Sequence, residues 1–113
     1  MLIWLQKVGA LGSTLRGKRL AISLSPGWFC TPKPSSQGYK GNFSAMAATE
    51  MVFGTALDFG LKRDIAVRML QFPETHEERP FLDFALRRLA SGQLLDRVVF
   101  CALWPAGKIQ TVL

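Results

Sequence analysis

The sequence predicts a mostly α-helical protein, with a small domain of about three helices after a flexible basic N-terminal segment. Apolar residues recur at helical spacing in the second half of the chain, and prolines and glycines stand where those segments end. The 113 residues are 49% hydrophobic, 11% aromatic and 19% charged, which is a globular composition. That length allows one domain. We expect the domain over residues 45–105 and a flexible tail over 106–113.

The first expected helix carries an apolar stripe with a spacing of four. The stripe consists of Phe53, Leu57, Leu61, Ile65 and Met69. Residues four apart lie on one face of a helix, so the stripe predicts a buried face. Glycines in a helix interior cost about 1 kcal/mol each, so the helix is expected to break near residue 60. The proline at position 73 ends the segment, because the residue before a proline disfavours the helical conformation.

The second and third expected helices follow an acidic loop, Pro-Glu-Thr-His-Glu-Glu-Arg, at residues 73–79. Pro80 suits the first position of a helix, where its missing N–H costs nothing. Gly92 suits the left-handed residue that closes it. Residues 93–104 are rich in β-branched and aromatic residues near their end, but the chain offers no partner strand. We therefore predict a third helix that ends at Pro105.

The N-terminal segment differs from the rest of the chain in charge. Residues 1–49 contain no Asp or Glu, and they carry the whole net charge of +6. A basic, serine-rich, acid-poor N-terminus resembles the presequence class of nuclear-encoded mitochondrial proteins. We therefore expect residues 1–44 to be a mitochondrial presequence with a Pro/Ser/Gly linker, and the protein to work in the matrix or at the matrix face of the inner membrane. The expected targeting residues are Lys7, Arg16, Lys18 and Arg19.

Few residues could support chemistry. The two cysteines, Cys30 and Cys101, lie far apart in the sequence, and with one histidine they cannot supply the four ligands of a zinc site. That histidine, His76, stands beside Glu77 and Glu78 and is expected to be solvated. The sequence has no Gly-x-Gly-x-x-Gly, Walker A, Gly-x-Ser-x-Gly or His-Glu-x-x-His motif. We expect no catalytic residues, no metal and no cofactor, and hence no enzyme activity.

These observations favour a non-catalytic mitochondrial accessory, assembly or adaptor protein that binds a protein partner or larger complex through an apolar helix face. Such a face also resembles an ordinary core. One alternative is a basic-armed protein associated with nucleic acid or the mitochondrial ribosome, and another is a truncated variant of a larger enzyme. No apolar run is long enough to span a bilayer, and the oligomeric state stays open. The expected partner-binding residues are Phe53, Leu57, Leu61, Ile65, Phe81, Leu82, Leu86 and Leu89.

Overall fold

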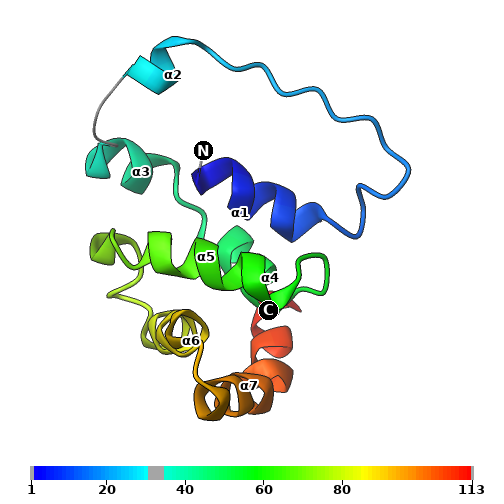
Figure 1. The fold of residues 1–113 in the computed structure, drawn as a ribbon, viewed down its shortest axis with the longest axis vertical. Coiled ribbons are helices and arrows are strands. Elements are labelled where there is room, and N and C mark those ends of the chain that lie inside the picture. The colour runs from blue at the N-terminus through cyan, green and yellow to red at the C-terminus, as the bar shows by residue number, and fades with distance from the viewer. Residues whose placement is uncertain (1, 31–34, 113) are drawn as a thin grey trace.

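The computed structural model describes residues 2–30 and 35–112, and it is mostly helical (Figure 1). The predicted fold class is confirmed. The expected number of helices is wrong, because the first expected helix is divided into two and residues 1–44 also contain helices. No β-strand occurs in the described ranges. The elements are α1 (Leu2–Leu11), α2 (Gly27–Cys30), α3 (Ser36–Asn42), α4 (Ala45–Phe53), α5 (Phe59–Met69), the 3-10 helix η1 (Pro73–Thr75), α6 (Pro80–Ser91) and α7 (Leu94–Val112).

Side-chain caps and special backbone residues fix several helix ends. Ser44 accepts a hydrogen bond from the Ala47 N–H at the start of α4, and Asp58 does the same for Leu61 at the start of α5. Such caps satisfy one of the free N–H groups of a first turn. Helix α6 begins at Pro80 and is followed by Gly92 with φ +67°, so both predicted boundary signals are confirmed.

The core lies where α4, α5, α6 and α7 meet, and Phe53 stands at its centre. The Phe53 ring is fully buried and stacks on Phe100 of α7 and Phe81 of α6, with ring centroids 5.6 and 5.7 Å apart. The indole N–H of Trp104 donates to the Phe53 carbonyl over 2.5 Å. Other buried apolar residues complete the core: Ala48, Met51, Val52, Ile65, Ala66, Met69, Leu82, Ala85, Leu86 and Leu89.

Helix α1 packs on α4 and α5 instead of forming part of a free arm (Figure 1). Gly9 is buried against α4, and a Cβ atom there would lie 2.7 Å from Cγ of Met51. Gly9 therefore allows α1 to approach α4 closely. Gln6 is also buried, and its amide donates to the Tyr39 hydroxyl of α3. The structure thus differs from the expected flexible segment over residues 1–44.

Helix α7 continues past Pro105 to Val112, so the chain does not become a loose tail at residue 106. A proline inside a helix removes one backbone donor and usually kinks or ends the helix. Here the turn after the proline is held by packing, because Gly107 is buried against the Phe53 ring. None of the described helices is both long enough and apolar enough to cross a bilayer.

We predict that Gly107→Ala destabilises the protein although alanine is the better helix former. A Cβ atom at position 107 would overlap the Phe53 ring. Overpacking costs about 1–3 kcal/mol, which outweighs the roughly 1 kcal/mol gained in helix propensity. The measurement is the free energy of unfolding in urea.

The matched control is Gly41→Ala in α3, where an added Cβ meets no atom within 4 Å. This variant is expected to be neutral or slightly more stable. Equal stability changes for both variants would contradict the close packing of α7 on Phe53.

Candidate functional site

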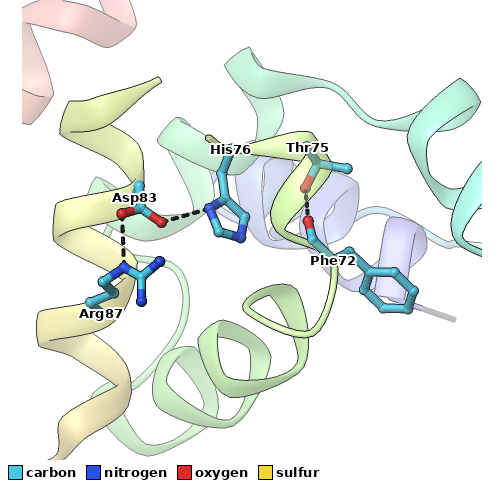
Figure 2. Close-up of polar contacts among 5 residues, drawn as sticks. All are labelled: Phe72, Thr75, His76, Asp83 and Arg87. Atoms are coloured by element: carbon cyan, nitrogen blue, oxygen red, sulfur yellow. Dashed lines mark hydrogen bonds and ion pairs between the residues drawn. The ribbon is translucent and has the colours of Figure 1, made fainter. Parts of the chain in front are cut away.

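The most concentrated polar cluster joins the loop after η1 to the first turns of α6 (Figure 2). His76 is fully buried, and its Nδ1 lies 2.7 Å from Oδ1 of Asp83. The contact brings opposite charges together when the imidazole is protonated, but it lacks the alignment of a hydrogen bond. Thr75, also buried, donates its hydroxyl proton to the Phe72 carbonyl over 2.8 Å. These contacts hold the connection between α5 and α6.

Asp83 also binds Arg87, one turn further along α6. Nε of Arg87 donates to Oδ2 of Asp83 over 2.8 Å. This hydrogen bond is the largest cause of a lowered Asp83 pKa, and His76 lowers it further, while burial opposes both. The same pair raises the pKa of Arg87. Asp83 therefore stays ionised and shares its two oxygens between an arginine on the surface and a histidine in the interior.

A histidine beside an aspartate is the orienting half of many proton-transfer sites. Catalysis would also need a substrate or a nucleophile at the other ring nitrogen. Nε2 of His76 is buried and has no hydrogen-bonding partner in the described part of the chain. In this fold His76 acts as a buried link between η1 and α6. The expectation that His76 is solvated is therefore wrong.

A second ion pair joins α6 to α7. Arg88 donates to Asp96 over 2.5 Å, and its guanidinium lies 4.9 Å from the centre of the Phe84 ring. A hydrogen bond with Ser91, followed by the contact with Arg88, lowers the pKa of Asp96. Together with Gly92, this pair sets the short turn between the two helices. Phe84 and Asp96 are not among the residues that the sequence pattern predicted for a site.

A small pocket of about 180 Å³ opens between α1, the end of α4 and α7. Ligand sites for small molecules are usually about 300–1,000 Å³, so this pocket is small for an organic substrate. Lys62 donates to the carbonyl of Gly54, which lines the pocket. Burial, followed by the charge of Lys108, lowers the pKa of Lys62. The pocket is lined by Gly9, Ala10, Ser13, Glu50, Gly54, Thr55, Ala56 and Lys108.

Metal-binding side chains do not gather in the described ranges. No group of three or more His, Cys, Asp or Glu residues there is placed to hold an ion. Cys30 and Cys101 are both exposed and free. Cys101 faces outward from α7 although it lies in an apolar run of the sequence.

The expected partner-binding residues lie mostly in the interior of this chain. Phe53, Ile65, Leu82, Leu86 and Leu89 are buried in the core. The side chains of residues 57 and 81 are partly buried against the same core, whereas that of residue 61 is 39% exposed. The helical spacing thus marked the core, and most of the predicted face is not available to a partner in the folded chain.

The four expected targeting residues are all exposed, on α1 and in the segment that follows it. Lys7 lies on the solvent side of α1, opposite the face that packs on α4. Arg16, Lys18 and Arg19 follow the last turn of that helix. Their exposure agrees with any solvated basic surface and does not by itself indicate a targeting role.

Comparison with known proteins decides the family. A family model described as "DltD protein" matches residues 1–111, nearly the whole chain. The chain belongs to the DltD family. Protein DltD of Bacillus subtilis is 27% identical over 95 residues, which cover 84% of this chain and 23% of the relative. Protein DltD of Staphylococcus aureus is 31% identical over 71 residues, which cover 63% of this chain and 18% of the relative. No solved structure matches.

This finding corrects the mitochondrial interpretation. The DltD match runs through the N-terminal residues that were expected to be a presequence, and the two relatives are bacterial proteins. The mitochondrial adaptor function, the transit peptide and the matrix localisation are therefore wrong. The acid-free composition of the N-terminal segment wrongly indicated a presequence. Helix α1 of that segment belongs to the packed fold, where Leu2 and Leu5 pack against the core. The chain spans less than a quarter of the length of these DltD relatives.

We predict that Asp83→Asn lowers the free energy of unfolding at pH 7 by about 1 kcal/mol, a small value because the pair with Arg87 is partly solvated. The folded-state pKa of Asp83 lies below its ordinary value of 3.8. Its ionised form therefore stabilises the fold above that value, and this contribution disappears as the pH falls through the folded-state pKa. Urea unfolding at pH 7 and near pH 3 measures the change.

The matched control is Asp64→Asn, at an exposed acid on α5. It should alter stability little at either pH. A deficit of Asp83→Asn that stays the same at low pH would contradict the ionic role of Asp83.

Proposed function

We propose that this chain acts as a segment of a DltD protein in the biosynthesis of D-alanyl-lipoteichoic acid. The family match over residues 1–111 carries this proposal. Relatives from two different bacteria align with most of the chain, and both are DltD proteins. Since the chain corresponds to less than a quarter of each, its contribution to that process is one part of a larger protein.

Within that protein, we propose that the chain is a helical module without an active site of its own. The chain's one histidine supports this view, because His76 is sealed in the fold and cannot reach a substrate. Its partner Asp83 is engaged by Arg87. Exposed apolar side chains support a role in contact with other regions or proteins. Leu94 and Leu95 at the start of α7 are both 79% exposed, and Val98 one turn later is 67% exposed.

The test places the full 113-residue chain in Bacillus subtilis DltD, in exchange for the segment that it matches. The chimera is expressed in cells that lack DltD, and the D-alanine ester content of their lipoteichoic acid is measured. We expect the chimera to restore most of the ester content. The control is the same relative with the segment deleted, which should restore none. A folded, well-expressed chimera with the ester content of the deletion control would contradict the proposed function.

A second experiment separates a structural role of His76 from a catalytic one. In the same chimera, His76→Gln should change the ester content only in proportion to the amount of folded protein. Loss of a catalytic histidine typically costs a factor of about 10³ or more in rate. A normal level of folded protein with the ester content abolished would therefore show that His76 takes part in the chemistry.

A further inference from the structure

Residues 19–25, between α1 and α2, stand apart from the helical packing. They form no helix, turn or strand, and every one of them is exposed. Figure 1 shows this stretch as a long arc that leaves the end of α1 and passes outside the body of the helices. No hydrogen bond joins residues 19–25 to any part of the described chain; the last backbone bond before them runs from Lys18 to Leu15.

The side chains of this stretch alternate. Leu20, Ile22 and Leu24 are 54%, 44% and 44% exposed, and small residues stand between them. Successive side chains of a β-strand point to opposite faces, so a period of two places these three apolar residues in one row. Ala21 and Ser23 fall on the opposite face. Seven residues lie within the usual length of a strand.

The boundaries of the stretch also suit a strand. It follows Gly17, whose φ of +75° turns the chain away from α1. It ends at Pro26, which lacks a backbone donor and is confined to the ends and edges of sheets. A row of exposed leucine and isoleucine on a backbone with free N–H and C=O groups is a ready template for pairing with another strand.

The described helices leave this row exposed, and they contain no strand that could offer a sheet edge. An edge that pairs with this stretch would therefore come from outside the described helices. The DltD match includes residues 19–25, so the stretch is part of the region shared with the family. More than three quarters of each DltD relative lies outside the aligned segment, which leaves ample chain to supply a sheet.

We propose that residues 19–25 form a β-strand that adds to an open β-sheet in the regions of a DltD protein that this chain does not include. Backbone pairing satisfies the free N–H and C=O groups, and the row of Leu20, Ile22 and Leu24 packs into the interior beside that sheet. This is strand addition, in which main-chain bonds supply affinity and alternate side chains supply specificity. The inference rests on the proposed function, because the sheet belongs to a DltD protein.

The test compares backbone hydrogen exchange of residues 19–25 in the isolated 113-residue chain and in the Bacillus subtilis chimera described above. In the isolated chain these amides should exchange at nearly the rate of an unstructured peptide. In the chimera those that bond to the sheet should exchange on the order of 100-fold more slowly, as expected for amides in a stable ladder.

Two matched variants of the chimera test the role of the apolar row. Ile22→Ser should return the amides of residues 19–25 toward the rate of the isolated chain, while amides of α4 and α6 keep their protection. Ile109→Ser removes an isoleucine that is 61% exposed on α7 and should leave exchange in residues 19–25 unchanged. Equal effects of the two variants on this stretch would overturn the proposal.

The outcomes distinguish this inference from the proposed function. A chimera that restores the D-alanine ester content but leaves residues 19–25 exchanging rapidly overturns the strand and keeps the function. A folded chimera without ester content, but with these amides protected, overturns the function and keeps the strand. Protection in the isolated chain that disappears on dilution assigns the pairing to a second copy, and protection only on added lipid vesicles assigns it to a membrane surface. Each of these last two results overturns the proposal.

Discussion

The whole packing arrangement depends on the carboxyl end of α4, where Phe53 lies. A helix leaves its last carbonyl groups without intrahelical partners, and burying them unpaired is costly. Here Trp104 of α7 donates to the carbonyl of Phe53, and Lys62 of α5 donates to that of Gly54. The same polar bonds that satisfy the end of α4 therefore bring α5 and α7 to it. The Phe53 ring then fills the space between them, stacked on Phe100.

This arrangement explains why the second half of the chain could be predicted from the sequence. The boundaries of α6 follow from the fixed φ of Pro80 and the left-handed Gly92, which are local properties. The apolar stripe correctly marked Phe53, Ile65 and Met69 as buried, although it spans two helices with a loop between them and its member at position 61 is exposed. Periodicity finds the buried side of a segment without showing what covers it. For that reason the same residues were taken for a partner-binding face.

The N-terminal half could not be predicted in this way, because its structure depends on contacts distant in sequence. Gly9 weakens an isolated helix, and only the crossing of α1 over Met51 shows why a side chain there would clash. Tyr39 lies in a stretch rich in glycine, proline and serine, yet it is buried and packs on Phe72 with the two rings tilted and their centroids 4.6 Å apart. Burial raises the pKa of this phenol to about 12, while the bond from Gln6 opposes the shift.

The site around His76 escaped prediction for a related reason. Its neighbours Glu77 and Glu78 are exposed, so the local sequence is that of a solvated loop. The turn after η1 directs only the imidazole inward, toward Asp83 seven residues later. The sequence does contain one weak signal for this contact. Asp83 is an acidic residue in the first turn of α6, and that helix follows the loop that contains His76.

Burial of the chain's one imidazole has a practical consequence. An imidazole that water does not reach becomes open to chemical modification only when the loop after η1 separates from α6. The rate at which a histidine-specific reagent labels the folded protein therefore measures how often this opening occurs, and no probe has to be introduced. Since no other histidine competes for the reagent, this one residue reports how often that local contact opens.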